Sequence, residues 1–145
     1  MRMQRGVTLV ELLTVVVIMG ILAAISVPSY RQYLLRANRT DAKSALMQLQ
    51  AAEEKFYLQN NLYTDKITDA PPTGLGLTNT TSHGYYLVGV TLKQVGGVDA
   101  QGYDAAAVPI TGKGQSDDAK CATFSINDGG TRNATGTLGP IPCWQ

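Results

Sequence analysis

A chain of 145 residues has room for one domain of ordinary size and little more. Its formal net charge is +1, and its twelve basic and eleven acidic side chains form neither a basic block nor an acidic tail. The overall composition therefore gives no indication of a nucleic-acid-binding protein. Fifteen glycines, most of them from Gly74 onward, predict a second half rich in turns.

The N-terminal segment combines a short basic leader with a long apolar run. Residues 7–27 would form a helix of about 31 Å, which matches the thickness of a bilayer core. Glu11 is the one carboxylate in this run, and a strongly charged residue at mid-bilayer costs roughly 2.5–3.5 kcal/mol. Three interpretations are open: a secretory signal, a plain membrane anchor, or a helix that is retained after cleavage just before it.

Cleavage after Gly6 would give Glu11 a partner. It frees an α-amine on Val7, and an amine and a carboxylate in low dielectric offset one another only when they are well paired. The apolar run is also longer than the roughly 7–15 residues of a secretory signal. These observations favour the third interpretation, with the amine and Glu11 paired within one chain or between neighbouring chains.

The sequence GVTLVEL at residues 6–12, behind its basic leader, resembles the class III signal of type IV prepilins. The resemblance implies cleavage by the prepilin peptidase between Gly6 and Val7 and N-methylation of Val7. It also implies subunit assembly through Glu11, with Thr8 beside it in the motif. Most of the family has phenylalanine where this chain has Val7. The implied partners are the major pilin, other minor pilins, the inner-membrane assembly platform and the lipid bilayer.

The helical pattern continues beyond the apolar run, and one helix from residue 7 to near Asn60 would be about 80 Å long. Apolar residues at helical spacing predict a stripe that packs on the chain's own head: Leu35, Ala42, Ala45, Leu46, Leu49, Ala52 and Phe56. The residues between them are expected to form a solvated face: Arg39, Lys43, Gln48, Gln50 and Lys55.

Gly20 and Pro28 interrupt the predicted helix. A kink is expected at Pro28, because proline removes one helical hydrogen bond and clashes with the preceding turn. The resemblance implies that the segment between the two residues loosens when the subunit enters the filament. Ordinary packing of a small residue in the membrane is the alternative for Gly20.

The head is predicted to be an antiparallel sheet of about four strands, so the fold class is α+β, a pilin fold. The strands are expected at residues 84–92, 103–110, 121–126 and 131–135. The Asn-Asp-Gly-Gly sequence at residues 127–130 marks the last turn. Glycine and proline are expected to keep residues 136–145 free of regular structure, and Trp144 is expected to pack as a hydrophobic plug.

Cys121 and Cys143 are the two cysteines of the chain. An even count, an export signal and a C-terminal placement favour a disulfide over a pair of unrelated free thiols. Such a bond would be worth roughly 3 kcal/mol in the chain-entropy model. It would also place the head outside the cytoplasm. The arginines on the two sides of the apolar run do not decide this orientation, because counting them gives nearly a tie.

The resemblance extends along the chain to the PilE-type minor pilins, through residues 36–42, 54–60 and 63–64 and the tail bounded by Cys121 and Cys143. It implies a leader at 1–6, a transmembrane and assembly half of the helix at 7–28, an amphipathic half at 29–60, and a β head at 61–145 with an αβ-loop. It further implies a single-pass protein of the inner membrane with a periplasmic head, and later a place in the surface pilus.

No catalytic residue, metal site or cofactor is predicted, and the chain is expected not to be an enzyme. His83 is the only histidine, and it lies in a polar run that predicts a solvated loop. The acidic residues Asp117, Asp118 and Asp128 do not have the spacing of a calcium loop and are expected to be exposed turn residues.

A structural role is the leading hypothesis: a minor subunit in pilus assembly and initiation, and hence in twitching motility and surface attachment. The alternatives are a DNA-binding minor pilin for competence and DNA uptake, and a pseudopilin of a type II secretion system. DNA binding needs cations that face phosphates, and the head offers Lys93, Lys113, Lys120 and Arg132. Removing the two leader arginines would leave ten basic against eleven acidic residues, with no basic stripe evident.

Overall fold

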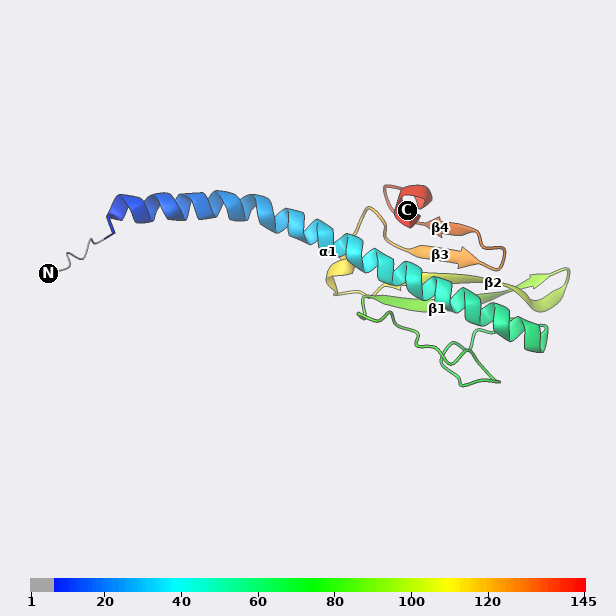
Figure 1. The fold of residues 1–145 in the computed structure, drawn as a ribbon. Helices are drawn as coiled ribbons and strands as arrows, with labels where there is room; N and C mark the ends of the chain where they lie inside the picture. Colours follow the sequence, from blue (N-terminus) through cyan, green and yellow to red (C-terminus); the bar gives the residue numbers. More distant parts are fainter. Residues whose placement is uncertain (1–6) are drawn as a thin grey trace. The chain divides into compact units, whose positions relative to one another are not determined.

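The computed structural model describes residues 7–145, and the chain divides into two compact units, Met1–Leu34 and Leu35–Gln145. The predicted leader, with Gly6, lies outside the described residues. Helix α1 enters both units, and the remaining elements belong to the second unit (Figure 1). The elements are α1 (Leu9–Asn60), β1 (Tyr86–Val95), β2 (Val98–Pro109), η1 (Gly114–Asp117), β3 (Phe124–Asn127), β4 (Arg132–Ala134) and α2 (Pro140–Trp144).

Within the first unit, every residue from 7 to 34 is exposed, including the apolar ones. A window of 18 residues in α1 has a mean hydropathy of 2.6, so the helix is long and apolar enough to cross a membrane by length and composition. The helix continues through Gly20 and Pro28. The kink and the loosening expected at these two residues stay predictions.

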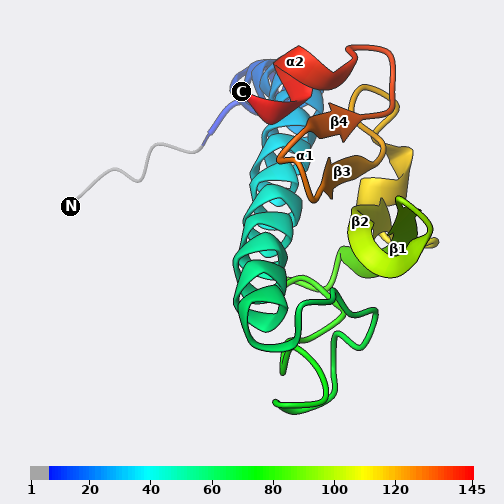
Figure 2. The ribbon, with the colours of Figure 1, turned by 90° about the vertical axis from the view of Figure 1, so that its right-hand side faces the viewer.

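The head contains the predicted antiparallel sheet, with strand order β1-β2-β3-β4. The C-terminal half of α1 lies across one face of this sheet, as Figures 1 and 2 show from two directions. Strands β1 and β2 are longer at their hairpin end than the sequence predicts. They meet at Gly96 and Gly97, whose positive φ angles of 62° and 84° suit the tight turn of a β-hairpin.

The core lies between α1 and the sheet. Leu35, Ala42 and Leu49 are buried as expected, whereas Phe56 is only partly buried at the margin. Aromatic residues of the strands complete the core, chiefly Tyr86, Tyr103 and Phe124, which are fully buried.

The prediction that Arg39 lies on a solvated helix face is wrong, because only 8% of this residue is exposed. Its guanidinium group lies against Asp118, which is also buried, with 2% exposed, and is therefore not the exposed turn residue expected. A charge at this position on the helix is accommodated because it has a buried partner 79 residues further along the chain.

The tail contains a short helix, α2, where the sequence predicted no regular structure. Proline fits there because Pro140 is the first residue of the helix, where an N–H group has no helical partner in any case. The predicted disulfide between Cys121 and Cys143 is present, with an S–S distance of 2.02 Å. The indole of Trp144 packs edge-on against Phe124, with ring centres 5.9 Å apart, as expected of a plug.

Candidate functional site

Thr8 and Glu11 contact each other at the start of α1. The main-chain N–H and the hydroxyl of Thr8 each donate to Oε2 of Glu11 at 2.9 Å, and the N–H of Glu11 donates to Oγ1 of Thr8 at 3.2 Å. This reciprocal arrangement is a capping box, which pairs N–H groups that the first turn of a helix leaves free. Glu11 thus has a partner in its own chain. Its role in assembly, and the processing of Val7, stay predictions.

A buried ion pair joins α1 to the segment before β3. Arg39 donates to the two carboxylate oxygens of Asp118 from Nε at 2.6 Å and from Nη2 at 2.8 Å. Asp118 also accepts from Nε2 of Gln115 at 3.1 Å and from the main-chain N–H groups of Lys120 and Cys121 at 3.2 and 3.4 Å. These bonds fix the position of Lys120 relative to α1.

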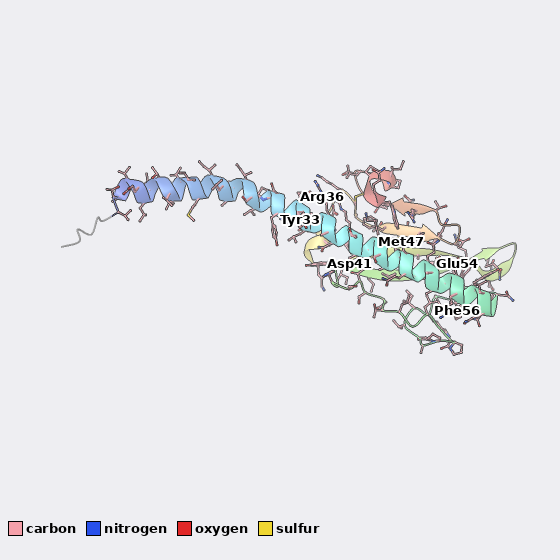
Figure 3. The ribbon with its side chains drawn as sticks, viewed as in Figure 1. Tyr33, Arg36, Asp41, Met47, Glu54 and Phe56 are labelled. Carbon is pink, nitrogen blue, oxygen red and sulfur yellow. A yellow bond between two sulfur atoms is a disulfide. The ribbon has the colours of Figure 1, made fainter. Side chains whose placement is uncertain are left out.

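A cleft of about 400 Å³ lies between α1 and the tail. Figure 2 shows α2, in red, beside α1 at this end of the head, and Figure 3 labels Arg36 on the helix. Four of the lining side chains are cationic and none is a carboxylate. The cleft is lined by Arg36, Arg39, Thr40, Lys43, Lys120, Leu138, Pro142, Cys143 and Gln145.

The charges in this cleft are only partly neutralised. Arg39 is paired with Asp118, and Nζ of Lys43 donates to the main-chain oxygen of Gln145 at 3.0 Å. Burial, followed by the positive charge of Arg39, lowers the pKa of Lys43. Within residues 7–145, no carboxylate lies at ion-pair distance from Arg36 or Lys120. The cleft is therefore electropositive and suited to an anion.

The structure does not bring the four candidate head cations together. Lys93 lies 3.1 Å from Asp104 and 3.0 Å from Asp128, Lys113 donates to the main-chain oxygen of Gly84, and Arg132 covers the ring of Trp144 at 5.3 Å. Lys120 alone of the four lines the cleft, where the other cations come from α1. The sequence alone does not indicate those helix residues as part of a site. Their signal is the spacing of Arg36, Thr40 and Lys43, which puts them on one helix face.

His83 and the possible metal ligands are the remaining titratable candidates. His83 is exposed, and its Nδ1 lies 3.2 Å from a carboxylate oxygen of Asp41. In the described part of the chain, no group of three or more potential metal ligands occurs.

Glu53 carries a fully buried carboxyl group on α1, which the sequence alone does not predict. Its Oε2 accepts the main-chain N–H of Thr64 at 3.2 Å, and its Oε1 has no hydrogen-bond partner among the described residues. Burial, joined by the charges of Glu54 and Asp65 and opposed by the Thr64 hydrogen bond, raises the pKa of Glu53 to about 7. Glu53 therefore takes up a proton on folding near neutral pH.

A Glu53→Gln variant of the soluble head is expected to be more stable than the wild type at pH 8, by roughly 2 kcal/mol. The contribution of Glu53 to the free energy of unfolding of the wild type is fully present below its ordinary pKa of 4.5. It is lost as the pH rises through about 7, because Glu53 must then ionise in the core. Urea unfolding between pH 4 and 8 should show the difference growing over this range. The exposed change Lys55→Gln should stay near wild type, and a constant difference for Glu53→Gln would contradict the prediction.

The fold and these sites together define a class of protein. A long helix with an exposed apolar first half, a four-stranded antiparallel sheet on its second half and a disulfide-bounded tail are the features of a type IV pilin. The prokaryotic N-terminal methylation motif matches residues 1–27. The family described as "Type IV minor pilin ComP, DNA uptake sequence receptor" matches residues 28–125, and the chain belongs to this family.

The individual relatives include a fimbrial protein and a type IV major pilin. The chain is 33% identical over 136 residues to a fimbrial protein of Pseudomonas aeruginosa, an alignment that covers 89% of this chain and 84% of that protein. It is 40% identical over 73 residues to the type IV major pilin protein PilA of Myxococcus xanthus. That alignment covers 48% of this chain and only 33% of the length of the Myxococcus protein.

Solved structures of pilins are also similar. The non-core minor pilin PilV of Neisseria meningitidis aligns with a TM-score of 0.50 at 20% identity, covering 73% of this chain and 91% of that one, and so supports the fold alone. A type IV pilin of Shewanella oneidensis aligns with a TM-score of 0.47 at 28% identity, covering 68% of this chain and 89% of that one.

Proposed function

We propose that this chain is a minor subunit of a type IV pilus whose head captures DNA. The family match over residues 28–125 carries the proposal, because that family is described by its receptor function for DNA uptake sequences. The cationic cleft supports it, because DNA binding depends on Lys and Arg side chains that neutralise phosphates. These two observations favour DNA capture over the purely structural role that the sequence alone puts first.

The processing steps of the proposal follow the N-terminal motif. The prepilin peptidase removes residues 1–6 and methylates Val7, residues 7–28 hold the subunit in the inner membrane, and residues 29–145 lie in the periplasm. On assembly the subunit leaves the bilayer for the surface pilus, with the helix loosening between Gly20 and Pro28. The match to the methylation motif and the exposed apolar helix support this sequence of events.

Participation in pilus assembly is the second candidate function. The relatives include fimbrial proteins and major pilins, and every residue from 7 to 34 is exposed. In this role the chain would contact the major pilin, other minor pilins and the assembly platform, and would contribute to twitching motility and attachment. Membership of a type IV pilin family favours a pilus over a type II secretion system, and a structural protein over an enzyme.

Binding of labelled duplex DNA by the soluble head, starting near Tyr30, tests DNA capture. The affinity is expected to fall by about 40-fold between 50 and 200 mM salt if three phosphates are contacted, since each contact contributes about −0.9 to the slope of log K against log salt. A gel-shift assay at the two salt concentrations measures this. Absence of binding at the lower salt, together with loss of pili on deletion of the gene, would leave the assembly role alone.

A further inference from the structure

We infer that the cleft between α1 and the tail is the backbone-binding site for DNA, in which Arg36, Lys43 and Lys120 contact phosphates. The inference rests on the proposed function and adds a location to it. The contacts are to phosphate and sugar, so the site positions the duplex and does not read its sequence.

The two walls of the cleft present their cations at different places along its length. Arg36, Thr40 and Lys43 follow one face of α1, and the helical rise separates the first from the last by about 10.5 Å. Lys120 faces them from the other wall, where Asp118 fixes its main chain. Cations at both ends of one wall and on the opposite wall suit an extended polyanion better than a single small anion.

The lining explains why this surface is attractive to phosphate. Arg36 and Lys120 are exposed and have no carboxylate partner among the described residues. Arg39 also lines the cleft, but Asp118 neutralises its charge. The net charge of the cleft is positive because of its other cations. Lys43 lines the cleft where burial, followed by the charge of Arg39, disfavours its cationic form and lowers its pKa. A bound phosphate would favour that form.

The apolar part of the lining fits the sugar of the DNA backbone. Leu138 is 46% exposed, and with Pro142 it forms the tail side of the cleft. A deoxyribose ring packed there would leave its flanking phosphates near the cations. An anionic lipid headgroup shares the phosphate chemistry but not the repeat of phosphate and sugar, and the family description favours DNA.

Fluorescence anisotropy with the full chain in neutral detergent and a labelled duplex of arbitrary sequence tests the location. Arg36→Gln with Lys120→Gln is expected to weaken binding by at least about tenfold at 50 mM salt and to reduce the salt slope by about 1.8. Lys43 is left unchanged because it bonds to Gln145. Lys55→Gln with Lys66→Gln removes the same charge outside the cleft and should keep the wild-type slope. Arg36→Lys with Lys120→Arg should keep the affinity.

The outcomes separate the location from the function. Equal loss in the two neutralised variants would mean that only net charge matters, and it would overturn the inference while DNA capture stands. Undiminished DNA binding by the variant Arg36→Gln with Lys120→Gln would also overturn the inference. If that variant instead loses binding to vesicles of anionic lipid, the cleft binds lipid headgroups and not DNA. Failure of the wild-type chain to bind DNA would overturn both the inference and the proposed function. Melting temperatures of all variants close to wild type confirm that the fold is intact.

Discussion

Replacing Asp118 with alanine is expected to lower the free energy of unfolding of the head by about 3–5 kcal/mol, since removing one partner of a buried ion pair leaves an uncompensated charge. The Arg39 guanidinium would stay in a site where only 8% of the residue is exposed. Gln115 and the N–H groups of Lys120 and Cys121 would also lose their acceptor. Denaturant unfolding of the soluble head with its disulfide intact measures the change.

Two further variants test the cause of that loss. Asp104→Ala removes a carboxylate that pairs with Lys93 in a setting where 60% of its side chain is exposed, and exposed pairs are worth about 0–1 kcal/mol. Arg39→Met combined with Asp118→Leu removes both charges and should recover most of the stability. If Asp118→Ala costs no more than Asp104→Ala, the pair does not hold the tail side of the head to α1.

The second large effect is expected from Glu11→Ala, which should remove the subunit from pili while leaving it in the membrane. On the proposed role, the carboxylate recruits a neighbouring chain by pairing with its N-terminal amine, and alanine cannot supply that charge. The local capping box alone would predict a milder effect, because loss of a helix cap costs about 1 kcal/mol. Immunoblots of sheared pili and of membrane fractions give the two amounts.

Glu11→Gln separates the two roles of this side chain. Glutamine keeps an oxygen that can accept from Thr8, and so preserves the cap, but it carries no charge. Exclusion of both variants from pili supports charge pairing between subunits. Incorporation of the glutamine variant alone would show that Glu11 acts as a cap. If piliation and twitching survive both Glu11→Ala and deletion of the whole gene, the assembly role is wrong.

The sequence predicts much of this fold because most of the fold follows from local patterns. The helical spacing of Leu35, Ala42 and Leu49 indicates the buried stripe of α1, and alternation through Phe124 and Ile126 indicates β3. The pairing of Cys121 and Cys143 needed no choice, because the chain has no other cysteine. Each of these inferences depends on neighbours in sequence or on a count.

The contacts that escaped prediction join distant parts of the chain. Arg39 looks like a surface residue until Asp118 is placed beside it, and that placement depends on how the sheet packs on the helix. The cleft has the same origin, because α1 and the tail each supply only part of the lining. Glu53 lies on the same helix face as Leu46 and Leu49, but a carboxyl group is not expected at a core position.

The tail is attached to the segment just before β3. The N–H groups of Thr137 and Leu138 donate to the carbonyl oxygens of Ala119 and Lys120, and the disulfide joins the adjacent Cys121 to Cys143. The tail side of the cleft is therefore held directly by residues 119–121. None of these three bonds involves the tip of the β3–β4 hairpin. The tip of the β3–β4 hairpin can therefore differ in sequence without moving either wall of the cleft.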